Sequence, residues 1–94
     1  MVVYQPALIY VQGYTSSVPC VGSVGSVAIY IYARDHSPPH FHALTAETAA
    51  LITIAGRVIL EGSLPKGAKK PVMAWAEKNE EMLQETWDRL NPDR

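Results

Sequence analysis

The chain has a single cysteine, Cys20, among its 94 residues. This excludes an internal disulfide bond, and such sparse use of cysteine is typical of a protein that works in a reducing cytoplasm. A chain of 94 residues has room for one compact domain with one modest hydrophobic core. We therefore expect a single cytoplasmic domain that is stabilised by packing.

An excess of positive charge is absent as well, because nine Asp and Glu residues balance eight Lys and Arg residues. The chain as a whole therefore has no strong electrostatic attraction to nucleic acids or anionic membranes. Residues 1–33 carry no charged side chain. Gln5, Pro6, Gln12 and Gly13 interrupt this segment well short of the roughly 20 apolar residues that a membrane-spanning helix needs. The segment also lacks the positive start of a secretory signal, so we expect no membrane association.

Alternating residues predict a small β-sheet after this uncharged segment. The clearest strand signal is SVAIYIYAR, where β-branched and aromatic residues recur with period two. The glycines and serines of CVGSVGS just before it indicate a flexible approach or a bulged edge. HFHALT, AALITI and RVILEG predict three further strands, at residues 40–45, 49–54 and 57–62. We expect a mostly antiparallel sheet of three to five strands.

The last third of the chain has the apolar period of an amphipathic helix. Pro71 is acceptable at the first helical position, and a kinked extra turn from Lys66 is the alternative start. Asn91 and Pro92 predict the end of the helix. The apolar stripe comprises Val72, Trp75, Ala76, Asn79, Met82, Leu83, Trp87 and Leu90.

Two polar residues, Asn79 and Thr86, lie inside that apolar stripe. They must be hydrogen-bonded when buried, or the stripe is partly an interface with another molecule. Together the segments predict an α+β domain: a small, mostly antiparallel sheet packed by one C-terminal amphipathic helix.

All three histidines lie in RDHSPPHFH, residues 34–42. His40 and His42 are two apart on a predicted strand, so their side chains leave the same face about 6.5–7 Å apart at Cα. His36, beyond the double proline, is a candidate third nitrogen ligand of a metal ion. Asp35 is a candidate carboxylate ligand, or an acceptor that fixes a histidine tautomer. Three histidines with an open position are the pattern of catalytic zinc, so zinc or another divalent transition metal is the candidate cofactor.

The same block also suits metal-free chemistry. His40 and His42 are candidates for general acid and base, and Arg34 for stabilising a phosphate-centred transition state. This trio suits RNA cleavage, with Tyr30 and Tyr32 as candidate stacking surfaces for bases. In the plain alternative the histidines face solvent or hydrogen-bond the loop, and the tyrosines only cover the sheet. Whether the protein is an enzyme stays open at this point.

A second candidate site is the basic cluster of Lys66, Lys69 and Lys70, with Gly67 between them. Its place at the start of the predicted helix suits the binding of a phosphate group. A solvated turn is the more common meaning of such a charge run, and we favour it here.

The run AIYIYARDHSPPHFHA, followed by ALITI, RVILEGSLP and a helix that contains tryptophan, resembles a small bacterial family catalogued as domain of unknown function 4160. RDHxPPHFH at residues 34–42 is the most specific part of the resemblance, and EG-LP at residues 61–65 supports it. The family has no established activity. Its members are often proposed, from gene neighbourhood, to be half of a toxin–antitoxin-like pair. The resemblance therefore implies a small protein partner encoded by a neighbouring gene.

The resemblance covers Val18 to about Leu90, and residues 1–17 have no counterpart in it. We therefore expect a single domain over residues 18–94. We hypothesise that translation naturally begins at Val18; the alternative is a natural start at Met1.

The sequence and the resemblance together favour one function: a toxin-like cytoplasmic component of a two-gene module that acts through His36, His40 and His42. RNA is the candidate substrate if the protein is an enzyme. The alternative is a non-catalytic metal-binding or protein-interaction module that uses the same histidines. Association into a homo-oligomer is compatible with either hypothesis.

Overall fold

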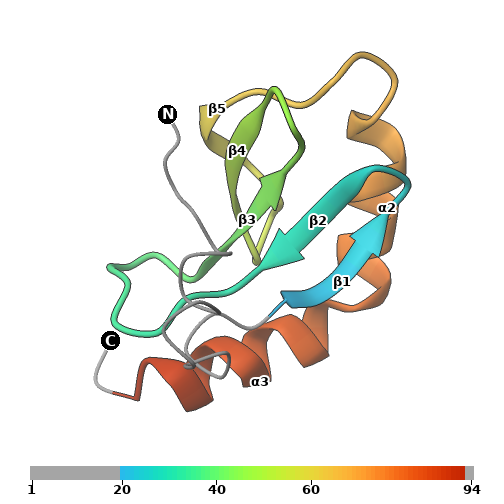
Figure 1. Ribbon diagram of the computed structural model, residues 1–94. Coiled ribbons are helices and arrows are strands. Elements are labelled where there is room, and N and C mark those ends of the chain that lie inside the picture. The colour runs from blue at the N-terminus through green and yellow to red at the C-terminus, as the bar shows by residue number, and fades with distance from the viewer. Residues whose placement is uncertain (1–19, 93–94) are drawn as a thin grey trace.

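The computed structural model describes residues 20–92 (Figure 1). The expectations for residues 1–17 and for a start at Val18 lie outside this range. The elements in chain order are β1 (Cys20–Val24), β2 (Val27–Tyr30), β3 (His40–Leu44), β4 (Ala49–Thr53), β5 (Ile59–Gly62), α2 (Lys69–Lys78) and α3 (Glu80–Leu90).

The five strands form one sheet in the order β1-β2-β3-β4-β5, and every neighbouring pair is antiparallel. The helices α2 and α3 lie together on one side of it (Figure 1). The predicted α+β class and the antiparallel sheet are therefore confirmed. The glycine-rich segment before β2 is the strand β1, whose register shifts between Cys20 and Gly22, so the prediction of a bulged edge is also confirmed.

The first predicted strand is shorter than its sequence pattern. Alternation suggested a strand that continues to Arg34, but pairing with β3 ends at Tyr30. The carbonyl of Tyr32 instead accepts a hydrogen bond from the Asn91 side chain at 3.1 Å. Arg34 then adopts a positive φ of 60°, which turns the chain away from the sheet. The residues after Tyr30 thus form the loop that carries the histidine block.

The hydrophobic core lies between the inner face of the sheet and the two helices. Phe41 and Ala43 of β3 are fully buried there, as their alternation with the histidines predicted. Neighbouring strands and both helices contribute Val27, Ile29, Ala50, Ile52, Val72, Ala76, Leu83 and Trp87. Burial on β3 does not alternate strictly, because His40 at its start is buried as well as Phe41 and Ala43.

The prediction of one C-terminal helix is wrong in detail, because two helices share the apolar stripe. α2 ends at Asn79, whose backbone leaves the helical region at φ −111° and ψ 20°, and α3 begins directly after it. The Asn79 side chain donates to the carbonyl of Trp75 at 2.8 Å, and Thr86 donates to the carbonyl of Met82 at 2.8 Å. Both polar residues in the stripe are therefore hydrogen-bonded. The sequence pattern did not predict the break at Asn79, because the break does not interrupt the apolar spacing.

The start of α2 matches neither predicted start, because it lies between Lys66 and Pro71. The helix begins at Lys69, so Pro71 lies in its first turn, where backbone N–H groups have no intrahelical acceptor. Gly67 precedes the helix with a φ of 82°. Among the described helices, none is long and apolar enough to cross a membrane.

Gly62 at the end of β5 should be the least replaceable glycine of the sheet. Its φ is 79°, and an added Cβ would collide with the carbonyl oxygen of Ala49 on the neighbouring strand. Gly25 has a similar φ of 59°, but nothing lies within 4 Å of an added Cβ. We expect Gly25→Ala to lower the free energy of unfolding by about 1–2 kcal/mol. Gly62→Ala should lower it by ~1–3 kcal/mol more than Gly25→Ala does, because the backbone at Ala49 must also move. Urea denaturation measures both, and equal losses would contradict this account.

Candidate functional site

The loop between β2 and β3 carries the first part of the histidine block and leads directly into β3, which contains His40 and His42. It contains the left-handed Arg34 and a cis peptide bond between Ser37 and Pro38. The loop is tied to the sheet where the backbone N–H of Ile54 donates to the carbonyl of Pro39 at 3.0 Å. This path brings Asp35 next to two residues that follow it by five and seven positions.

Asp35, His40 and His42 converge on one point. Oδ2 of Asp35 lies 2.9 Å from Nε2 of His40 and 3.2 Å from Nε2 of His42. The His40 side chain is fully buried, whereas the side chains of Asp35 and His42 are 17% and 21% exposed. One ligand atom from each of the three residues lies within 4.8 Å of the other two, a separation that permits all three to bind one metal ion. The strand register predicted that both histidines share a face, and the loop adds the carboxylate.

The tautomer of His40 follows from its second hydrogen bond. Nδ1 of His40 lies 2.7 Å from the carbonyl oxygen of Pro38. A carbonyl oxygen only accepts hydrogen bonds, so Nδ1 carries the proton and donates it. In the neutral ring the lone pair is therefore on Nε2, which faces Asp35. A histidine whose outer nitrogen donates to a backbone carbonyl is the usual arrangement of a metal ligand.

Aromatic side chains surround the three converging residues. The ring of Trp87 lies 5.0 Å from that of His40, and the ring of Tyr32 lies 4.5 Å from that of His42, measured between centroids. Tyr30 stacks on Tyr32 with centroids 6.1 Å apart. The predicted role of these tyrosines in base stacking stays a prediction.

Two residues of the predicted site lie outside this cluster. His36 is 76% exposed at its side chain, and its Nε2 is 3.8 Å from Oδ1 of Asp35, the oxygen that does not face the other histidines. Its ring centroid is 5.5 Å from that of His40. Arg34 is exposed on the left-handed turn. The structure thus assembles one carboxylate and two imidazoles instead of three imidazoles.

The electrostatics of the site favour an ionised Asp35 and a neutral His42. Burial alone would raise the pKa of Asp35. The hydrogen bond from His42, the backbone N–H of His36 and the nearby imidazoles outweigh this effect and lower that pKa below its ordinary 3.8. Burial lowers the pKa of His42 below its ordinary 6.5, more than the Asp35 carboxylate raises it. A deprotonated carboxylate and a neutral imidazole are the states in which these groups bind metal ions.

Sequence reasoning missed Asn91, which it used only as a helix end. Asn91 is 3% exposed, and its Oδ1 accepts the backbone N–H of Asp35 at 2.7 Å. Its Nδ2 donates to the carbonyls of Tyr32 at 3.1 Å and of Trp87 at 3.3 Å. The signal in the sequence is an amide directly before Pro92, in place of the glycine that often ends a helix. That signal does not reveal a partner 56 residues earlier in the chain.

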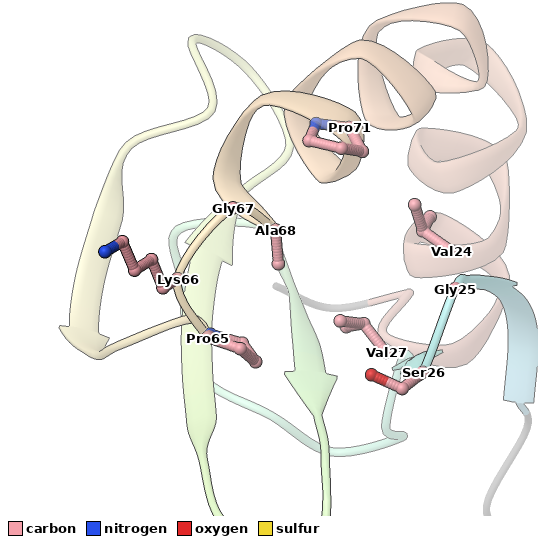
Figure 2. Close-up of a pocket in the computed structure, with 9 residues that line it drawn as sticks. All are labelled: Val24, Gly25, Ser26, Val27, Pro65, Lys66, Gly67, Ala68 and Pro71. Atoms are coloured by element: carbon pink, nitrogen blue, oxygen red, sulfur yellow. The ribbon is translucent and has the colours of Figure 1, made fainter.

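The predicted lysine site has a different character. Lys66 lines a hollow of about 230 Å³ between the β1–β2 turn and the start of α2, whereas Lys69 and Lys70 do not. Figure 2 shows the Lys66 ammonium extending away from this hollow. Its other walls are formed mainly by carbon atoms of Val24, Val27, Pro65, Ala68 and Pro71. Phosphate binding by the three lysines stays a prediction.

Comparison with known proteins places residues 27–88 in a family described as Domain of unknown function (DUF4160), whose model matches this range. The matched range contains the whole histidine block and ends before Asn91. No curated protein and no solved structure matches the chain.

Both pKa shifts predict that the metal-free fold loses stability in acid. The contribution of His42 is fully present above 6.5 and is lost as the pH falls from there through its lower folded pKa. The contribution of Asp35 is fully present above 3.8 and is lost as the pH falls through its own lowered pKa. Urea denaturation with a chelator between pH 8 and 4 should show the loss that His42 causes, whereas the loss that Asp35 causes lies below this range. His42→Asn should flatten the slope just below pH 6.5, and an unchanged slope would contradict the assignment.

Proposed function

The chain belongs to the family of domain of unknown function 4160, and we propose that Asp35, His40 and His42 bind a divalent transition metal ion. The observation that carries this proposal is the meeting of two imidazole nitrogens at one carboxylate oxygen. That oxygen, Oδ2 of Asp35, lies 2.9 and 3.2 Å from the two Nε2 atoms.

The buried His40 supports the proposal through its hydrogen bonding. With Nδ1 donating to Pro38, the neutral ring points a lone pair at the ionised Asp35 over 2.9 Å. Two electron-rich atoms at that separation repel each other unless a cation lies between them or beside them. A second proton on Nε2 of His40 would remove this repulsion but would involve His40 alone. A metal ion would also remove the repulsion between His40 and Asp35, and it would bind His42 as well.

The distances fit a shared ion. Ligand atoms at about 2.0–2.2 Å from one zinc ion lie on the order of 3 Å apart, which is the separation found here. Two histidines and one carboxylate leave coordination positions open, which is typical of reactive centres; closed structural sites have four protein ligands. This donor set suits zinc or iron better than magnesium or calcium, which prefer oxygen ligands.

The open coordination positions would allow a bound metal ion to take part in a reaction. A bound divalent ion lowers the pKa of a coordinated water and polarises a substrate oxygen, which serves hydrolysis. His42 also lines a hollow of about 180 Å³ with Leu51, Glu61 and Gly62, so a small molecule in that hollow would contact a ligand of the ion. The proposed class is therefore a metal-binding domain with an accessible coordination sphere.

We propose the biological setting from the family resemblance. The family resemblance suggests a bacterial toxin-like component with a small protein partner encoded nearby, and RNA is the candidate substrate. The single cysteine supports a cytoplasmic location. Both the toxin-like role and the interaction-module alternative were predicted to act through the histidine cluster, which includes His40 and His42, so the first test is whether the converging residues bind metal.

Purified protein should bind one zinc ion per chain, as measured by elemental analysis and isothermal titration. His42→Ala removes a partly exposed ligand and should weaken binding by more than about 100-fold, because even the loss of a group behind a ligand costs 10–100-fold. Asp35→Asn should have a similar effect. Zinc at 100 times its dissociation constant should stabilise the wild type by about 2.7 kcal/mol.

His36→Ala is the matched control in the same loop, since His36 is exposed and outside the converging group. It should keep the wild-type affinity. Absence of stoichiometric zinc, iron, cobalt or manganese binding by the wild type would refute the proposal. A large loss in His36→Ala would instead support the three-histidine site expected from the sequence.

Induced expression in bacteria tests the toxin-like role. The wild type should arrest growth, and His42→Ala should not, because it removes a member of the site. Co-expression of the neighbouring gene should relieve the arrest. Arrest that persists in a His40→Ala/His42→Ala double variant would exclude the site as its cause.

A further inference from the structure

We propose that Asn91 is the positioning residue of this site: through its side-chain amide, the end of α3 holds the Asp35 loop so that the carboxylate reaches both histidines. This inference rests on the proposed metal binding by Asp35, His40 and His42. It assigns a role to a residue that lies outside the range matched by the family model.

The Asn91 amide makes hydrogen bonds to three backbone groups, two in the Asp35 loop and one in α3. Oδ1 accepts the N–H of Asp35 at 2.7 Å, and Nδ2 donates to the carbonyl of Tyr32 at 3.1 Å. These two peptide groups lie on either side of the turn at Arg34, so the Asn91 amide links the two ends of the turn. Nδ2 also donates to the carbonyl of Trp87 at 3.3 Å, which fixes the amide to the last turn of α3. With 3% exposure, the amide is largely shielded from competing water.

The turn needs such support because its own conformation is unfavourable. Arg34 has a φ of 60°, a left-handed conformation that costs a non-glycine residue about 1–2 kcal/mol. Asp35 follows directly, so the turn sets the direction from which its carboxylate approaches. The Asp35 carboxylate itself has a local backbone contact, from the N–H of His36 to Oδ1 at 2.9 Å. The Asn91 side chain ties the Asp35 backbone to an element 56 residues away in the chain.

The same helical turn also supports a second ligand. Trp87 precedes Asn91 by one turn, and its ring packs 5.0 Å from the buried ring of His40. The end of α3 thus contacts Asp35 through an amide and His40 through an indole. Metal affinity depends on such supporting groups, because they hold the ligands in the bound geometry before the ion arrives.

An amide is well matched to this position. It accepts from one peptide N–H and donates to two carbonyls at once, which an alkyl or hydroxyl side chain cannot reproduce. A carboxylate would keep the acceptor for Asp35 but would face the carbonyls of Tyr32 and Trp87 without a proton. Asn91→Asp therefore separates the acceptor function from the donor function, while Asn91→Ala removes both.

The test compares zinc affinity in Asn91→Ala, Asn91→Asp and a matched control, Asn79→Ala. Asn79 ends α2 with a similar side-chain bond to the carbonyl of Trp75 and touches none of the three ligands. We expect Asn91→Ala to weaken zinc binding by about 10–100-fold, with Asn91→Asp affected as well. Asn79→Ala should lower thermal stability and keep the wild-type affinity. Visible absorption of bound Co²⁺, which reports ligand geometry, should change in the Asn91 variants and not in the control.

The outcomes separate this inference from the proposal beneath it. If the wild type binds no metal, the metal site itself fails. If the wild type binds and folded Asn91→Ala binds equally tightly with an unchanged Co²⁺ spectrum, the positioning role is overturned. If the Asn91 variants do not fold, the amide resonances of the wild type decide. Zinc should shift the Asn91 side-chain NH₂ signals together with the Asp35 N–H, and unmoved signals beside shifted histidine signals would overturn the role.

Discussion

The contact of one oxygen, Oδ2 of Asp35, with the Nε2 atoms of His40 and His42 is the interaction on which the rest of this site depends. It places an ionised carboxylate against a buried imidazole whose other nitrogen is already committed to the Pro38 carbonyl. Such an arrangement is costly when it lacks a compensating cation, because burial removes the water that would otherwise solvate the charge. The meeting of these three groups is the reason for assigning function there.

The fold supplies this contact with rigid support on two sides. β3 is held between β2 and β4, and its inward residues Phe41 and Ala43 are fully buried, so the two histidines are fixed on the opposite face. The carboxylate comes from the adjoining loop, which Asn91 at the end of α3 holds in place. Sites that are built on packed elements are more precise than sites on loops alone. The loop is thus hydrogen-bonded both to α3 and to the sheet.

Local patterns in the sequence predicted much of this arrangement. Period-two alternation gave the sheet and the shared face of both histidines, and chain proximity made Asp35 a candidate ligand. What the sequence did not reveal depends on tertiary contacts. The helix break at Asn79 leaves the apolar spacing intact, and the exposed position of His36 depends on the path of the loop. The partnership between Asn91 and Asp35 spans 56 residues, and no local rule reports it.

The most direct test of the central claim is a crystal structure of the zinc-loaded protein with anomalous scattering at the zinc absorption edge. The account predicts one anomalous peak per chain, about 2.0–2.2 Å from Oδ2 of Asp35 and from Nε2 of both His40 and His42. Nδ1 of His40 should still donate to the carbonyl of Pro38. A peak at His36 without the other three residues, or no ordered zinc at the converging group, would contradict it.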